Sequence, residues 1–147
     1  MTRQQNMKAQ FHVVVAGAFA GGLYAATGSW PATLTCFVSG VLIDVDHLLD
    51  YTLEHYESFG IRHFFATWDS GSLRRAYLVF HSWELFIALA LATALMGWNL
   101  FVLGLAVGVG HHLVFDQIAY RPHPLAYSFF WRWWNGFGLK ESFRRRG

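Results

Sequence analysis

The sequence has almost no cysteine: Cys36 is the only one in the 147-residue chain. A disulfide within the chain is therefore impossible, and so is a zinc knuckle built from several thiolates. Cys36 lies in the middle of an apolar segment, and we interpret it as a small buried residue.

Charged residues are missing from two long segments, residues 11–43 and 85–115. A helix needs about 20 residues to cross a bilayer once, and each segment is longer than that. Turn residues break each segment near its middle, at 28–31 and 97–99. The pattern predicts two helical hairpins and therefore an all-α fold, a polytopic membrane protein with a four-transmembrane-helix bundle. We expect the helices at about residues 11–26, 31–51, 77–96 and 100–118, followed by an interfacial tail over 122–147.

The composition describes one small apolar domain over residues 1–147, with 54% hydrophobic residues. The formal net charge of +2 does not indicate a nucleic-acid partner. All eleven Lys and Arg lie in residues 1–10, in 51–77 or after 116, which share one side of the bundle. The positive-inside rule therefore predicts an inner (cytoplasmic) membrane protein with both termini in the cytoplasm. Residues 1–27 also have the pattern of a signal peptide. We expect them to remain as the first helix, because their removal would leave an odd number of spans.

The connection over residues 51–77 is long and polar, and we expect a surface helix near 63–68 that lies over this end of the bundle. The aromatic run at 127–134 is typical of segments at the lipid headgroups, so membrane lipid is an expected partner. Two glycine pairs, Gly17 with Gly21 and Gly104 with Gly108, would allow close helix packing. The sequence leaves open whether the bundle forms an oligomer.

Histidines and carboxylates gather at the same end of all four expected helices. They open the first and third helices and close the second and fourth, so an up-down-up-down path brings them together. A charge inside a membrane helix costs about 3 kcal/mol on insertion scales, and such residues usually line an interior site. His112 and Asp116 are four residues apart and therefore share one helix face. We predict that the metal ligands are His12, Asp44, Asp46, His47, His81, His112 and Asp116.

Imidazole and carboxylate ligands suit a divalent ion, with zinc first and Mn, Fe or Mg as alternatives. The number of candidate ligands predicts one or two ions. The ion would activate a water molecule for hydrolysis. Glu84 would transfer the proton, and a substrate phosphate would be neutralised by Arg74, Arg75 or Arg121. Simpler interpretations stay open: Glu84 would support or join His81 as a ligand, and the arginines would only follow the positive-inside pattern.

Several short motifs resemble a known family. They are Asp44-Val45-Asp46-His47 after an apolar helix, the dipeptide His81-Ser82, and the segment from Gly108 and Gly110 to His112 and Asp116. These motifs resemble the bacterial membrane-bound metal-dependent hydrolases of the YdjM-like type. The resemblance covers most of the chain, includes an early histidine at His12, and implies a metal-dependent hydrolase.

The leading hypothesis is a membrane-embedded divalent-metal-dependent hydrolase. Its expected substrate is a phosphoester or ester of a lipid or lipid-linked molecule near the cytoplasmic surface. The alternative is a non-enzymatic metal-stabilised membrane subunit or a small ion-conducting module, which needs the ligands but no open coordination position. A haem protein is disfavoured, because acidic residues accompany every candidate histidine.

Overall fold

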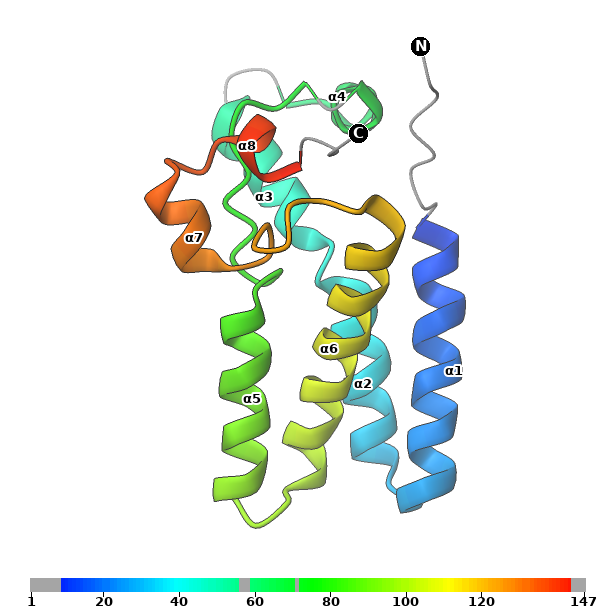
Figure 1. Ribbon diagram of the computed structural model, residues 1–147. Helices are drawn as coiled ribbons and strands as arrows, with labels where there is room; N and C mark the ends of the chain where they lie inside the picture. The colour runs from blue at the N-terminus through cyan, green and yellow to red at the C-terminus, as the bar shows by residue number, and fades with distance from the viewer. Residues whose placement is uncertain (1–8, 56–58, 71, 144–147) are drawn as a thin grey trace.

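The computed structural model describes residues 9–55, 59–70 and 72–143, and within these ranges every regular element is a helix. Figure 1 shows two layers, with both hairpin turns at one end of the molecule and a group of shorter helices at the other. The all-α expectation is confirmed. The long layer consists of α1 (Ala9–Thr27), α2 (Trp30–Leu42), α5 (Trp83–Leu95) and α6 (Leu100–Tyr120). The layer above it consists of α3 (Val45–Glu54), α4 (Ile61–Ser70), α7 (Phe129–Trp134) and α8 (Leu139–Phe143).

Both hairpin turns are built by local capping. The Ser29 side chain accepts a hydrogen bond from the Ala32 amide at 3.3 Å, and Pro31 occupies the first turn of α2. Asn99 does the same for α6, accepting from the amides of Phe101 and Val102. Each cap satisfies amides that a helix start leaves without an intrahelical partner. The turn residues identified in the sequence therefore produce the expected hairpins.

The close approach of α2 and α6 depends on the second glycine pair. A side chain at Gly104 would collide with Thr35 Oγ1 and the Ala32 carbonyl, and one at Gly108 would collide with Ser39 Oγ and the Cys36 carbonyl. The hydroxyls of Thr35 and Ser39 also donate to carbonyl oxygens of α6. At the first pair, Gly17 and Gly21, an added methyl group would meet no atom within 4 Å among the described residues. Only the pair on α6 is used for packing within the described part of the chain.

The prediction of one continuous helix over 31–51 is wrong in one respect, because a turn divides this segment into two helices. The helix α2 ends at Leu42, and α3 begins at Val45 after the turn at Ile43 and Asp44. Asp44 stands at the N-cap position of α3 but makes no side-chain cap hydrogen bond. Its carboxylate instead lies beside His81 and His112, and the turn gives it that direction.

The expected helix over 77–96 starts later than predicted, at Trp83. Ser82 caps α5 through the Leu85 amide, and residues 77–82 form a non-helical segment, here called the strap. Carboxylates of α3 bind the strap amides: Asp50 accepts from Leu78, and Asp46 accepts from Phe80 and His81. These bonds replace the helical ones, so the polar residues of α3 decide the conformation of the strap.

The upper layer contains the surface helix that the polar connection predicted, as α4. Buried Tyr51 of α3 joins α3 to α4 through a 2.7 Å hydrogen bond with His63 Nδ1. The C-terminal segment is joined to the strap's entry, where Ala76 donates to the Phe137 carbonyl and Leu139 donates to the Arg74 carbonyl. The tail therefore packs on the bundle and forms no further long helix among the described residues.

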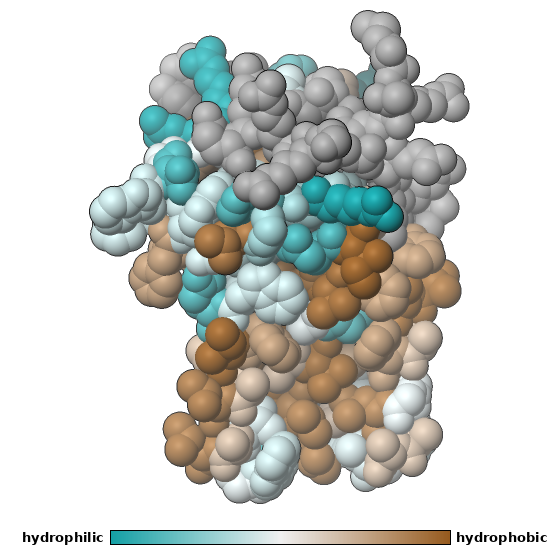
Figure 2. Space-filling view, in the orientation of Figure 1, coloured by the Kyte–Doolittle hydropathy of each residue, from teal (hydrophilic) through white to brown (hydrophobic). Residues whose placement is uncertain are grey.

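Two helices of the described residues are long and apolar enough to cross a membrane. They are Trp30–Glu54, which runs through α2, the turn and α3, and Leu100–Tyr120. The helices Phe11–Thr27 and Trp83–Leu95 are apolar but shorter. Figure 2 shows hydrophobic residues over the lower layer and hydrophilic residues around the upper one. Length and composition therefore support two of the four expected crossings, and four crossings stay a prediction.

Candidate metal centre

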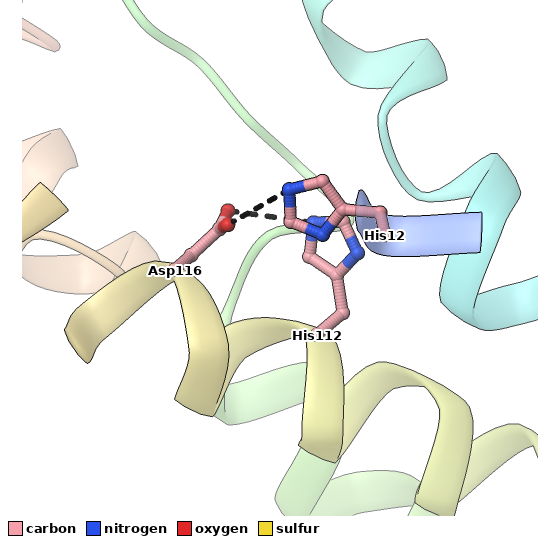
Figure 3. A group of neighbouring side chains, drawn as sticks. All are labelled: His12, His112 and Asp116. Atoms are coloured by element: carbon pink, nitrogen blue, oxygen red, sulfur yellow. Dashed lines mark ion pairs between the residues drawn. The ribbon is translucent and has the colours of Figure 1, made fainter. Parts of the chain in front are cut away.

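Four elements bring the centre of the predicted cluster to one place, where the two layers meet. The helix α6 carries His112 and Asp116 on one face, and α1 presents His12 beside them (Figure 3). The turn after α2 supplies Asp44, and the end of the strap supplies His81. The shared end of four helices, expected from the sequence, is therefore a real juxtaposition of side chains.

Four donor atoms face one another at the centre: Nε2 of His81, Nε2 of His112, Oδ1 of Asp44 and Oδ2 of Asp116. His112 Nε2 lies 3.3 Å from the Asp44 oxygen and 3.4 Å from the Asp116 oxygen. His81 Nε2 lies 3.5 and 3.8 Å from the same two oxygens, and 3.2 Å from His112 Nε2. Ligands about 2.1 Å from a tetrahedral zinc ion lie roughly 3.4 Å from each other. We call these four atoms the donor cage: each carboxylate oxygen lies at about ligand spacing from both histidine nitrogens, and Asp44, His81 and His112 together form a group that could hold one ion.

The second nitrogen of each imidazole is engaged outside the cage. His112 Nδ1 lies 2.8 Å from the Gly40 carbonyl oxygen, which can only accept, so Nδ1 carries the proton. His81 Nδ1 lies 3.2 Å from Asp46 Oδ2 and likewise donates to it when the carboxylate is ionised. In the neutral rings both Nε2 atoms then present lone pairs to the cage. Metal-binding histidines are oriented in this way by carboxylates or backbone carbonyls.

The buried Asp46 binds His81 on the side of the ring that faces away from the cage. Its Oδ2 accepts from the His81 ring, from the His81 amide at 2.9 Å and from the Phe80 amide. The sequence predicted Asp46 as a ligand, but the structure directs this oxygen at the strap. Asp46 thus fixes both the backbone and the tautomer of a cage histidine.

His12 adds a further ligand candidate at the edge of the cage. Its ring stacks on His112 with 4.3 Å between centroids, and its Nε2 lies 3.4 Å from Asp116 Oδ1 (Figure 3). Asp116 Oδ1 is buried and accepts no hydrogen bond from the described residues. His12, His112 and Asp116 also meet the spacing of a metal group, as do Asp44, His81 and His112. The two groups share His112, which allows one ion in either group or two adjacent ions.

The remaining predicted site residues lie around the cage or away from it. His47 is near its rim, with Nε2 3.9 Å from Asp44 Oδ1 and its ring 5.0 Å from that of His81. Glu84 accepts hydrogen bonds from the Ser128 hydroxyl at 2.6 Å and the Phe129 amide at 2.9 Å, at the start of α7. The structure therefore places His47 beside the cage, whereas Glu84 binds the start of α7.

The three predicted phosphate-binding arginines are not grouped at the cage. Arg74 and Arg75 are exposed, and their side chains lie near Glu54 and Tyr77 respectively. Arg121 is exposed at the end of α6, with a left-handed backbone at φ 46°.

Two residues near the cage were missed by reasoning from the sequence. Arg132 is fully buried and donates to the carbonyls of Leu78 in the strap and Ala126. Its position as the single charge in an aromatic run was a usable signal, because a buried guanidinium needs partners. The Tyr127 hydroxyl lies 3.5 Å from Asp116 Oδ2, and burial raises the pKa of Tyr127 well above its usual range. Tyr127 therefore stays protonated and donates to this carboxylate.

No family model matches the chain, and no curated protein or solved structure matches it either. The likeness to YdjM-like hydrolases therefore depends on the short motifs and stays a prediction. What the described residues establish is a buried group of histidines and aspartates that could hold a metal ion.

Proposed function

We propose that the chain is a membrane-embedded, divalent-metal-dependent hydrolase with its site near the cytoplasmic surface of the inner membrane. Its substrate is a phosphoester or ester of a lipid or lipid-linked molecule. The donor cage is the observation that carries this proposal, because two lone-pair nitrogens lie beside two carboxylates, with His81, His112 and Asp116 buried and Asp44 partly exposed. Zinc is the first candidate, and Mn, Fe or Mg are alternatives.

The membrane part of the proposal uses all four long helices. In a four-crossing arrangement α1, α2, α5 and α6 span the bilayer, and the upper layer lies at the cytoplasmic headgroups. The apolar surface of the lower layer and the absence of Lys and Arg from both hairpin turns support this arrangement. The motif resemblance to the YdjM-like family supports the same location and the same class of reaction.

In the reaction that we propose, a bound divalent ion supplies a Lewis acid that polarises the substrate and lowers the pKa of water. The oxygen of water forms a bond to the phosphorus or carbonyl carbon, and the bond from that atom to the leaving oxygen breaks. His47, at the edge of the cage beside Asp44, accepts the proton of water and returns it to the leaving oxygen. His81, His112 and Asp116 are the buried residues that would hold the ion.

Metal content tests the cage directly. Elemental analysis of the purified full-length protein is expected to find at least one divalent ion per chain, and His112→Ala is expected to lose it. His111→Ala is the matched control, because His111 is the adjacent buried histidine but its ring stacks on Phe19. Retention of stoichiometric metal by His112→Ala would exclude this site.

A non-enzymatic, metal-stabilised subunit is the second candidate, and one observation favours it. The cage offers four protein donors, the number that fills a closed tetrahedral site, whereas catalytic zinc sites keep an open position. A chelator would then unfold the protein, and the metal-loaded form would hydrolyse neither phosphoesters nor esters. Hydrolysis that disappears with the metal and returns with it would favour the enzyme.

A further inference from the structure

The donor cage is exposed on one side only. The side chains of His81 and His112 are fully buried, and that of Asp116 is 4% exposed. The side chain of Asp44 is 33% exposed, so Asp44 is the point at which the cage meets its surroundings. A molecule that reaches the metal without unfolding the protein must therefore arrive beside Asp44.

The upper layer lies over the cage, where Tyr127 packs against His81 with 6.2 Å between ring centroids, and this layer contains further buried side chains. Tyr51 on α3, Leu78 in the strap and Tyr127 before α7 are all at most 2% exposed. Buried Arg132 links the strap to the C-terminal segment by donating to Leu78 and Ala126 carbonyls. The direct route from the cytoplasmic side is therefore filled by packed side chains and by hydrogen bonds.

Apolar side chains flank the exposed side instead. Leu42 and Val45, on the two sides of the turn that holds Asp44, are exposed. In the strap, Val79 and Phe80 directly precede His81 and are exposed as well. We call these four residues the rim.

One face of α2 continues from the rim toward the hairpin turns. Leu34 and Val38 precede Leu42 at intervals of four residues, and all three are exposed. In Figure 1 α1 and α5 lie on opposite sides of the α2 and α6 pair, and α5 packs on α6. The exposed α2 residues are thus left for lipid, and they lead to the one exposed ligand.

We propose that the substrate is a phosphate-headed lipid that enters sideways from the bilayer, past the rim. This inference depends on the proposed function and specifies the class of lipid and the route by which it enters. The phosphate reaches the cage beside Asp44, while the hydrocarbon chains remain along Leu42 and the exposed face of α2. Continuity between an apolar surface and the only open edge of the cage argues for one amphiphilic ligand.

Hydrolysis in nanodiscs tests the proposal with the full-length, metal-loaded protein. The probes are long-chain phosphatidic acid and water-soluble glycerol phosphate. Leu42→Asn is expected to lower kcat/KM for phosphatidic acid about tenfold, since burial of one leucine side chain is lost. The value for glycerol phosphate is expected to stay unchanged. The matched control is Leu91→Asn, because Leu91 is 59% exposed and Leu42 56%, but Leu91 lies on α5, outside the rim and the exposed face of α2.

A binding experiment separates the inference from the chemistry. Phosphatidic acid with a photoreactive group in its acyl chain is expected to label peptides that contain Leu42 or Phe80 more than those that contain Leu95. Leu95 is 87% exposed and is the last residue of α5, next to the hairpin turn at the far end from the cage. Labelling at the rim without hydrolysis would support the entry route and contradict the hydrolase. Equal labelling of all exposed positions, or equal effects of Leu42→Asn and Leu91→Asn, would overturn the entry route.

Discussion

The Nε2 atoms of His81 and His112 lie 3.2 Å apart, although each ring has a proton acceptor for its Nδ1 nitrogen. Two neutral imidazoles in this arrangement present lone pairs to each other and to two carboxylate oxygens. These lone pairs repel one another, and a bound divalent ion would replace the repulsion with coordination. The surrounding chain holds this pair in place, and substitutions there are expected to have measurable effects.

Asp46→Asn is expected to weaken metal binding by about 10- to 100-fold without removing the ion at saturating concentration. The substitution removes the negative charge that binds His81 Nδ1, but all four atoms of the donor cage remain. Competition with a zinc chelator measures the dissociation constant. Asp50→Asn is the matched control, because Asp50 also accepts from a strap amide, that of Leu78, one turn of α3 beyond Asp46. If both variants bind metal like the wild type, Asp46 has no role behind His81.

Gly108→Ala is expected to destabilise the bundle by about 1–3 kcal/mol, the usual effect of overpacking. Its new methyl group would collide with Ser39 Oγ and with the backbone carbonyl of Cys36 in α2. Thermal unfolding in detergent measures the loss. Gly21→Ala is the control on α1, where an added methyl group meets nothing within 4 Å among the described residues. Equal unfolding temperatures for the two variants would contradict the close packing of α2 and α6.

Arg132→Met is expected to destabilise the upper layer by about 2–3 kcal/mol, because the carbonyls of Leu78 and Ala126 lose a charged donor. Hydrogen exchange at the strap amides should increase, and the chelator assay should show weaker metal binding. Arg132→Lys restores the charge and is expected to recover part of the stability. Unchanged exchange in the strap would show that Arg132 does not hold it.

His47→Ala is expected to reduce turnover about 100-fold or more while the metal content stays near that of the wild type. The reason is that His47 lies at the edge of the cage beside Asp44, outside the four cage atoms. Glu84→Gln is the informative comparison, because its carboxylate binds Ser128 and the Phe129 amide. That variant should lose some stability of α7 but keep its turnover. A large loss of turnover in Glu84→Gln alone would return the proton transfer to Glu84.

Several features were predictable because they depend on local sequence. The missing charges in 11–43 and 85–115, with turn residues in the middle of each, predict two hairpins regardless of distant contacts. Helical periodicity also places His112 and Asp116 on one face of α6. The order of the helices then brings His12, Asp44 and His81 to the same end.

The tertiary structure decided which atoms face the cage. As carboxylates near histidines, Asp46 and Glu84 are equivalent to Asp44 in the sequence, but Asp46 binds the strap and Glu84 binds the start of α7. The glycine pairs have the same spacing, yet only Gly104 and Gly108 meet a neighbouring helix in the described part of the chain. Residue type and spacing thus determined the hairpins and the end at which the polar residues gather. Only the packing of α3, the strap and α7 decided their roles, because a carboxylate binds whichever donors the distant chain brings to it.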